Sequence, residues 1–192
     1  EHWLDLCAGP GGKSALLAAL AAGRGADLLA VERQPHRAEL VRRALAGADG
    51  VRGVLTADGT RPPLVAGSFD RVLVDAPCTG LGALRRRPES RWRRRPDDLD
   101  VLVDLQRRLL ASALDLVRPG GLVLYATCSP VLAETREVVT ATLGSVAGSE
   151  LVDLGPQHAA VPGAEGPMAG TVQLWPHRHR TDAMFMALLR RG

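Results

Sequence analysis

The chain has 192 residues, of which 46% are hydrophobic, and its formal net charge at pH 7 is +3. This length supports one domain with a buried core, and the mild positive charge favours a polyanionic partner. No apolar stretch is long enough to cross a bilayer and no signal-peptide pattern opens the chain, so we expect a cytoplasmic protein without a membrane partner. The three cysteines form neither a CxxC pair nor a Cys/His cluster at zinc spacing, which argues against a disulfide framework and predicts no metal site.

Predicted strands and helices alternate along the chain. We expect strands at residues 3–7, 27–32, 51–56, 69–75, 122–129 and 182–191, helices at 13–22, 34–46, 97–117 and 131–143, and a Gly/Pro-rich loop at 155–170. The sequence RPGG at 118–121 is expected to end the third helix. This alternation predicts an α/β fold with a doubly wound, mostly parallel sheet. Ligands bind beyond the carboxyl ends of the strands in such sheets, so the turns after the first five strands should share one crevice.

The first of these turns lies in the sequence LDLCAGPGGKS at residues 4–14. It misses the phosphate-binding pattern GxxxxGK[ST] because Cys7 stands where the first glycine belongs, and it misses the dinucleotide pattern GxGxxG because Ser14 replaces the third glycine. A tight turn before a helix N-terminus still favours an anionic or carboxylate group. Glu32 ends the second predicted strand, about 20 residues downstream, where a carboxylate accepts hydrogen bonds from ribose hydroxyls.

The cofactor that these positions suggest contains a ribose. Asp58 follows the third predicted strand and adds an acceptor for the edge of an adenine. S-adenosylmethionine has the ribose, the adenine and the carboxylate that this layout requires, and NAD is the alternative. The Tyr-x-x-x-Lys pair that would favour hydride transfer is missing, because Tyr125 is the only tyrosine and Lys13 is the only lysine.

Two of the three cysteines follow predicted strands, Cys78 in DAPCTGLG and Cys128 in TCS. A buried, inert thiol is the ordinary interpretation of a lone cysteine, and it suits Cys7 in its apolar strand. Cys128 precedes Ser129, which we expect to cap the next helix, and a helix N-terminus favours a thiolate over a thiol. A thiolate adds to an electron-poor ring carbon. Two thiols, the nearby Asp75 and a methyl donor therefore indicate methylation of a pyrimidine carbon.

Three stretches resemble motifs of the Sun/Fmu (RsmB-like) family of RNA 5-methylcytosine methyltransferases. They are LDLCAGPGGKS at 4–14, DAPCTGLGALRRRPESRW at 75–92 and YATCS at 125–129, and the resemblance extends to the tail WPHRHRTDAMF at 175–185. The tail departs from the family's usual Asp-Gly-Phe-Phe, which we expect to affect packing more than chemistry. The resemblance implies a Rossmann-like class I methyltransferase fold with an antiparallel C-terminal strand. It also implies that residues 1–192 are a catalytic domain and that an N-terminal RNA-binding part lies outside this chain.

The resemblance also implies roles for individual residues. Cys128 would attack carbon 6 of cytosine, after which carbon 5 accepts the methyl group of S-adenosylmethionine. Cys78 would help to remove the carbon 5 proton and to release the product. Asp75 would hydrogen-bond the base near ring nitrogen 3, and Lys13 would orient groups in the crevice. The residues expected to bind the cofactor are Cys7, Ala8, Gly9, Pro10, Gly11, Gly12, Lys13, Glu32, Arg37, Asp58, Gly59, Asp75 and Pro77.

An Arg-rich segment at residues 85–95 follows the Cys78 motif and contains seven arginines and one tryptophan. We expect phosphate contacts and base stacking here. The residues predicted to contact RNA are Arg85, Arg86, Arg87, Arg91 and Trp92. The alternative is a solvated loop that Pro88 and Trp92 pin to the body of the domain. Basic residues at 177–180 (His177, Arg178, His179 and Arg180) could add to the same surface.

The leading interpretation is therefore an S-adenosylmethionine-dependent RNA cytosine methyltransferase acting on 16S ribosomal RNA. A tRNA methyltransferase, a catalytically idle RNA-binding relative and an NAD-dependent oxidoreductase are the alternatives. The presence of both Cys78 and Cys128 argues against an idle module, because packing does not require two thiols at these turns.

Overall fold

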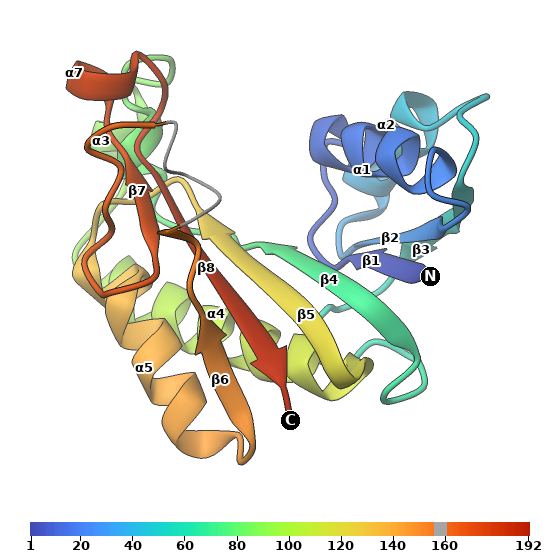
Figure 1. Cartoon of the computed structure of the whole chain (residues 1–192). Helices are drawn as coiled ribbons and strands as arrows, with labels where there is room; N and C mark the ends of the chain where they lie inside the picture. The colour runs from blue at the N-terminus through green and yellow to red at the C-terminus, as the bar shows by residue number, and fades with distance from the viewer. Residues whose placement is uncertain (156–160) are drawn as a thin grey trace.

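A central sheet with helices on both faces forms the body of the molecule (Figure 1). The computed structural model describes residues 1–155 and 161–192. The strands in these residues are β1 (His2–Asp5), β2 (Asp27–Glu32), β3 (Val51–Thr56), β4 (Phe69–Asp75), β5 (Val117–Thr127), β6 (Ser149–Val152), β7 (Val172–Leu174) and β8 (Met184–Arg191). The α-helices are α1 (Gly12–Ala22), α2 (Pro35–Ala44), α3 (Ser90–Arg93), α4 (Asp97–Leu116), α5 (Arg136–Ser145) and α7 (Pro176–His179). The same residues contain two short 3₁₀ helices, η1 (Leu81–Ala83) and η2 (Leu132–Glu134).

The strand order across the sheet is β3-β2-β1-β4-β5-β8-β6, and β7 pairs with β8 beside this path. Neighbouring strands from β3 to β5 are parallel, whereas β8 runs antiparallel to β5, β6 and β7. This confirms the predicted doubly wound, mostly parallel sheet with an antiparallel C-terminal strand. The chain order reverses between β1 and β4, and this switch point favours a ligand crevice beyond the carboxyl ends of these strands.

Two hydrophobic clusters hold the helices against the two faces of the sheet. Helices α1 and α2 contact β2 and β3, and the cluster on that face includes Ala18 and Val41. Helix α4 contacts β4, β5 and α5 on the opposite face, where Leu110, Leu114 and Tyr125 are fully buried (Figure 1). Burying one such leucine contributes roughly 1.5–3 kcal/mol relative to leaving it exposed, so the apolar period of α4 fixes this helix on the sheet.

The junction between α4 and β5 differs from the prediction. The helix ends at Leu116 and the strand begins at Val117, so the RPGG sequence at 118–121 lies inside β5. The register between β4 and β5 shifts at this point: Phe69 pairs with Val117, and Arg71 pairs with Leu122. The proline and the two glycines are therefore accommodated by a bulge in the strand pair.

The remaining differences concern the ends of elements and short elements. Strand β1 ends at Asp5 and not at residue 7, and the short helices η1, α3 and α7 were not predicted. Helix α5 begins at Arg136, after η2, and not at residue 131, and the fifth strand ends at Thr127 and not at residue 129. Strands β6 and β7 have only four and three residues, too few to show an alternating pattern in the sequence. The predicted loop at 155–170 includes residues 156–160, which lie outside the described residues. Residues 161–170 form turns, with one isolated β-bridge from Glu165 to Val172.

Candidate active site

A cleft of about 620 Å³ lies beyond the carboxyl ends of the first five strands. Its walls include Glu32 at the end of β2, Asp58 after β3, Asp75 at the end of β4, and the two cysteines Cys78 and Cys128. This confirms that the turns after these strands share one crevice. The predicted cofactor-binding residues that line it are Cys7, Gly9, Pro10, Lys13, Glu32, Arg37, Asp58, Gly59, Asp75 and Pro77.

A smaller hollow of about 240 Å³ lies at the glycine turn, and Ala8 and Gly12 contribute to it together with residues of the main cleft. Gly11 lines neither space and instead allows the tight turn at the start of α1 and the close packing of α1 against α2. It adopts a φ of +114° at the N-cap of α1, and an added Cβ would come within 2.6 Å of the Ala44 Cβ on α2. Any side chain at Gly11 would therefore strain the turn and push the two helices apart.

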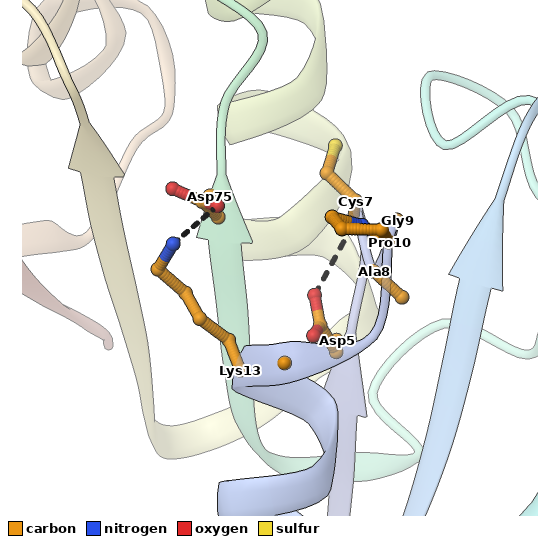
Figure 2. A pocket seen from close by; sticks show the side chains of 8 residues that line it. Asp5, Cys7, Ala8, Gly9, Pro10, Lys13 and Asp75 are labelled. Atoms are coloured by element: carbon orange, nitrogen blue, oxygen red, sulfur yellow. Dashed lines mark hydrogen bonds and ion pairs between the residues drawn. The ribbon is translucent and has the colours of Figure 1, made fainter. Parts of the chain in front are cut away.

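Asp5 was not among the predicted site residues, but it anchors the glycine turn from the end of β1. Its carboxylate is fully buried and accepts hydrogen bonds from Ser14 Oγ at 2.6 Å and from the Cys7 backbone N–H at 3.3 Å. Figure 2 shows the Asp5 carboxylate beneath the turn, with its hydrogen bond to the turn's backbone at Cys7 as a dashed line. Burial raises the pKa of Asp5 to about 6, because an ionised carboxylate is costly away from water. Burial also raises the pKa of Cys7, which fits the predicted role of an inert packing thiol.

Glu32 connects the end of β2 to the glycine turn. Its carboxylate accepts hydrogen bonds from the backbone N–H groups of Gly9 at 3.0 Å and Gln34 at 2.9 Å. Arg37 completes the connection by donating from Nη2 to the Gly9 carbonyl at 2.6 Å. An added Cβ at Gly9 would lie only 2.2 Å from Glu32 Oε2, so this close approach requires glycine.

Asp58 and Gly59 form the part of the cleft that lies beyond β3. Asp58 accepts hydrogen bonds from the Thr60 N–H at 2.9 Å and from Thr60 Oγ1 at 2.8 Å, and these bonds lower the pKa of its carboxyl. An added Cβ at Gly59 would come within 2.9 Å of Leu109 Cδ2, because α4 packs closely here. Leu109 and two further leucines of α4, Leu102 and Leu105, give this end of the cleft an apolar wall.

Lys13 and Asp75 form an ion pair in the middle of the cleft. Lys13 Nζ donates to Asp75 Oδ2 at 2.8 Å, and Figure 2 shows the lysine side chain reaching from the start of α1 to the end of β4. Both side chains are partly exposed to the cleft, so they are accessible to a bound molecule.

The two cysteines after β4 and β5 face each other, with 3.4 Å between Cys78 Sγ and Cys128 Sγ. Cys78 is buried and Cys128 is half-buried. The pKa of Cys128 is lowered to about 7, chiefly because the Cys78 thiol donates a hydrogen bond to its sulfur, and the pKa of Cys78 is raised by the same interaction. Near neutral pH, Cys128 is therefore the cysteine of the pair that readily forms a thiolate, and Cys78 stays protonated beside it.

The predicted reason for a reactive Cys128 was wrong. Ser129 does not cap an α-helix, because the chain first forms η2, and α5 begins at Arg136. Ser129 Oγ instead donates to Glu134 Oε2 at 2.5 Å and accepts from the Val131 N–H at 3.1 Å. The hydrogen bond from Cys78, and not a helix N-terminus, is the main cause of the lowered pKa of Cys128.

The Arg-rich segment borders the cleft, and part of it is bound to the protein itself. Arg85 and Arg86 both hydrogen-bond the buried carboxylate of Asp182, at 3.3 Å and 3.0 Å from their Nε atoms to Oδ1. Arg94, which was not among the predicted contacts, donates to the Thr79 and Cys78 carbonyls at 3.1 Å and 3.2 Å. Asp182 and Arg94 therefore attach this segment to the thiol-bearing turn and to the start of β8.

Trp92 lies on the exposed part of the Arg-rich segment. Its side chain is 83% exposed, and the Arg91 guanidinium stacks over its ring at 5.4 Å from the centroid. The alternative in which Trp92 pins the loop to the body is therefore wrong, and a free aromatic face remains beside the cleft. Of the other predicted RNA contacts, Arg86 and Arg87 line the cleft itself.

The basic residues at 177–180 form α7 and the turn after it, which Figure 1 draws at the same end of the molecule as α3. His179 has a structural role: its Nδ1 accepts from the Trp175 N–H at 2.8 Å, and its Nε2 lies 3.1 Å from the Pro162 carbonyl. Arg178 donates to the Gly163 carbonyl at 3.5 Å. The short helix is thereby attached to the 161–170 segment.

Within residues 1–155 and 161–192, no group of three or more His, Cys, Asp or Glu side chains is arranged to hold a metal ion. No helix of this part of the chain is long and apolar enough to cross a membrane.

Comparison with protein families identifies the family of the chain. The model of the family described as "16S rRNA methyltransferase RsmB/F" matches residues 1–190. The chain belongs to this family. The membership confirms the resemblance carried by LDLCAGPGGKS, DAPCTGLG and YATCS.

Curated proteins align with almost the whole chain. Rv1407 of Mycobacterium tuberculosis, which carries a methyltransferase name, is 56% identical over 99% of this chain and 40% of its own length. The ribosomal RNA small subunit methyltransferase B of Pectobacterium atrosepticum is 36% identical over 98% of this chain and 42% of its own length. The chain thus spans about two fifths of the length of the curated relatives that it matches.

Solved structures confirm the fold class that the RsmB/F motifs imply. The crystal structure of PH0851 superposes with a TM-score of 0.91 at 36% identity, covering 100% of this chain and 42% of that one. NSun6 from Pyrococcus horikoshii with SFG gives a TM-score of 0.82 at 26% identity, over 98% of this chain and 47% of that one. The chain has the Rossmann-like fold of class I methyltransferases.

Proposed function

We propose that this chain transfers a methyl group from S-adenosylmethionine to carbon 5 of a cytosine in RNA, and that 16S ribosomal RNA is the substrate. The observation that carries the proposal is the pair of thiols 3.4 Å apart, in a cleft that also holds the Lys13–Asp75 ion pair. Family membership and the names of the ribosomal RNA methyltransferase relatives support the choice of RNA. Because those relatives are longer, we propose that residues 1–192 are the catalytic portion of such an enzyme.

The residues of the cleft fit S-adenosylmethionine. A volume of about 620 Å³ is in the usual range for small-molecule sites. Glu32 lies where a carboxylate can accept the ribose hydroxyls, and Asp58 and the leucines of α4 provide an acceptor and an apolar wall for an adenine. NSun6, a related structure, contains SFG, an analogue of S-adenosylmethionine. When bound, this cofactor supplies an electrophilic methyl group.

Cys128 is the nucleophile in this proposal. Its thiolate adds to carbon 6 of the cytosine, forming a carbon–sulfur bond and directing electron density to carbon 5, which then accepts the methyl group. A pKa of about 7 supplies the thiolate at neutral pH without making the sulfur a poor nucleophile. Asp75 lies in the same cleft and would hydrogen-bond the base near ring nitrogen 3, with Lys13 fixing the carboxylate.

Cys78 acts at release. After methylation, carbon 5 carries both a methyl group and a proton, and the carbon–sulfur bond cannot break until that proton leaves. Once Cys128 is bonded to carbon 6, its sulfur no longer needs the hydrogen bond from Cys78. Cys78 gives its own proton to solvent and, as a thiolate, accepts the carbon 5 proton. The electron pair of the broken carbon–hydrogen bond re-forms the ring double bond, and Cys128 departs as a thiolate. Cys78 lies near enough to the Cys128 sulfur to reach the neighbouring ring carbon of a base attached there.

The rim of the cleft would contact the RNA. Arg87 and Arg91 supply positive charge for phosphates, and the exposed Trp92 offers a stacking face. Arg85 and Arg86 would contact RNA while remaining paired with Asp182. The target cytosine must be unstacked to enter the cleft, as in other enzymes that act on ring atoms of a base.

Covalent trapping tests the proposal. We expect Cys78→Ala to accumulate a protein–RNA adduct that survives a denaturing gel when S-adenosylmethionine and unmethylated 16S ribosomal RNA are present, because addition occurs without release. Cys128→Ala should form no adduct. An adduct with Cys128→Ala would show that the two roles are exchanged, and no adduct with either variant would refute covalent catalysis.

Transfer of tritiated methyl groups, followed by analysis of the labelled base, tests the product and the substrate. We expect 5-methylcytosine in unmethylated 16S ribosomal RNA and no label in tRNA. Label in tRNA alone would favour the tRNA methyltransferase alternative. No label in any RNA, with S-adenosylmethionine still bound, would favour an idle relative.

A further inference from the structure

A carboxylate without exposure to solvent lies between the two thiol-bearing turns. Glu134, the last residue of η2, is 0% exposed. Its Oε1 accepts from the Thr79 N–H at 2.8 Å and from Gln106 Nε2 at 3.0 Å. Its Oε2 accepts from Thr79 Oγ1 at 2.6 Å and from Ser129 Oγ at 2.5 Å. Four donors from three separate segments of the chain therefore converge on one side chain.

These donors are adjacent to the reactive sulfurs in the sequence. Thr79 follows Cys78 directly, and Ser129 follows Cys128 directly. Gln106 of α4 also donates to the carbonyl of Pro77, the residue before Cys78, at 2.9 Å. The carboxylate thus holds both sides of the Cys78 turn and the far side of the Cys128 turn.

The position of Glu134 is itself fixed by the sheet. The hydroxyl of Tyr125, a fully buried residue of β5, donates to the Glu134 carbonyl at 2.8 Å. Because Tyr125 lies three residues before Cys128, the strand that leads directly into the nucleophile also holds Glu134 in place.

We propose that Glu134 is a positioning residue that sets the distance and the hydrogen bond between Cys78 and Cys128. The proposal rests on the proposed function only for its consequence in catalysis, since the geometry of the thiols exists without RNA. It differs from a purely structural role because three of the four donors come from Thr79 and Ser129, the residues that directly follow the two cysteines. The fourth donor, Gln106, also holds the Pro77 carbonyl just before Cys78.

The charge of Glu134 adds to this argument. A buried carboxylate is costly unless its hydrogen bonds are complete, and no Lys, Arg or His forms an ion pair with Glu134 in the part of the chain that the structure describes. A fold that needed only a spacer would be better served by a neutral residue. The negative charge instead contributes to the raised pKa of Cys78, which keeps that thiol protonated as the donor to Cys128.

Thiol labelling of the apo chain tests the proposal directly. The charged groups that face the thiol pair are Asp75 from β4, Lys13 from α1, Arg86 from the Arg-rich segment and Glu134 from η2. Iodoacetamide reacts with thiolates, and mass spectrometry separates the Cys78 and Cys128 peptides. In the parent chain we expect labelling of Cys128 with a midpoint near pH 7 and little labelling of Cys78.

Glu134→Gln keeps the shape of the side chain but cannot accept all four hydrogen bonds, because its amide nitrogen is a donor. We expect the labelling rate of Cys128 at pH 7 to fall by about threefold to tenfold, and the ratio of Cys78 to Cys128 labelling to rise by about tenfold, as a shift of one pKa unit would produce. Thr142→Val is the matched control. It removes a buried hydroxyl of α5 that bonds only the Val138 carbonyl in its own helix, so the labelling ratio should not change.

If Glu134→Gln does not fold, Ser129→Ala provides a second test of the proposal. It removes one of the four donors, and we expect the same change in labelling ratio at a smaller size. A folded Glu134→Gln with the parent labelling ratio and midpoint would refute the proposal, as would an unchanged ratio in Ser129→Ala when Glu134→Gln is unfolded.

A kinetic measurement links the positioning role of Glu134 to methyl transfer. We expect Glu134→Gln to lower kcat by about tenfold to a hundredfold while the KM for RNA changes less than about twofold, because misplaced reacting groups slow the chemical step more than binding. If the parent chain transfers no methyl group to RNA but labelling shifts as described, the proposed function is refuted and the positioning role of Glu134 is supported. If methyl transfer occurs and labelling does not shift, the proposed function is supported and the positioning role of Glu134 is refuted.

Discussion

Replacing Asp5 by asparagine offers a test of how the glycine turn is held. Asparagine has the same shape as aspartate, its carbonyl oxygen can accept from the Cys7 N–H, and its amide can donate to Ser14 Oγ. The variant Asp5→Asn therefore preserves the hydrogen bonds at 2.6 Å and 3.3 Å as contacts while removing the buried charge.

The size of the effect follows from the pKa of Asp5. Burial raises it from 3.8 to about 6 in the folded chain. A shift of about two units corresponds to about 3 kcal/mol of unfolding free energy. The folded state binds more protons than the unfolded state between these values. The stability that protonated Asp5 provides is therefore complete below about pH 4 and is lost as the pH rises through about 6.

Urea unfolding, followed by tryptophan fluorescence, measures this effect as a double difference. We expect the unfolding free energy of Asp5→Asn minus that of the parent chain to increase by about 2.5 kcal/mol between about pH 4 and about pH 7.5, because a small part of the full difference is already lost at pH 4. All other titrating groups cancel, because they are common to both proteins. Asp49→Asn, which changes an exposed carboxylate in the turn before β3, is the matched control and should show no such increase.

A double difference below about 1 kcal/mol would refute the reasoning, since it would mean that Asp5 titrates like a carboxylate in water. An increase of similar size in Asp49→Asn would show that the effect does not come from burial. The expected result would also mean that the parent chain gives up stability at neutral pH to keep a charged acid beneath its glycine turn.

Three further predictions concern the cleft. Gly9→Ala should lower the affinity for S-adenosylmethionine by at least about tenfold in a calorimetric titration, because the new Cβ would lie 2.2 Å from Glu32 Oε2. Gly144→Ala on α5, where an added Cβ meets nothing within 4 Å, is its control and should bind normally. The initial rate of methyl transfer should rise with pH through about 7 and then level, because Cys128 becomes a thiolate over that range. Trp92→Ala should change the unfolding free energy by less than about 0.5 kcal/mol, since the side chain is 83% exposed, yet weaken RNA binding about fivefold or more in a filter-binding assay.

Each of these has a result that would contradict it. Normal cofactor affinity in Gly9→Ala would show that the turn can move away from Glu32 without loss. A rate that does not change between about pH 5.5 and about pH 8.5 would show that formation of the thiolate does not limit the reaction. Unchanged RNA affinity in Trp92→Ala would remove this residue from the proposed RNA-binding rim.

The crevice could be predicted from the sequence because its residues follow directly after apolar runs. Glu32, Asp75, Cys78 and Cys128 each lie at or just beyond the end of a recognisable strand, and a parallel sheet brings such positions to one edge.

The roles of Glu134, Ser129 and Asp182 could not be predicted in this way. Glu134 lies in the sequence PVLAETRE, where it resembles an exposed acid near the start of a helix, and only the packing of α4 and β5 around η2 buries it. Ser129 satisfies the pattern of a helix cap, but tertiary hydrogen bonding to Glu134 overrides that local preference. Asp182 is separated from Arg86 by 96 residues, a distance over which sequence patterns give no information on pairing.

Strand β8 imposes an order on the assembly of the protein during translation. It lies between β5 and β6 in the sheet but follows both in the chain, so β6 cannot join the sheet until the ribosome has released residues 184–191. The start of this late segment supplies Met184, which forms part of the cleft wall, and Asp182, which binds the Arg-rich segment, lies just before it. A nascent chain halted before this point would have both cysteines and the glycine turn but an unfinished catalytic cleft.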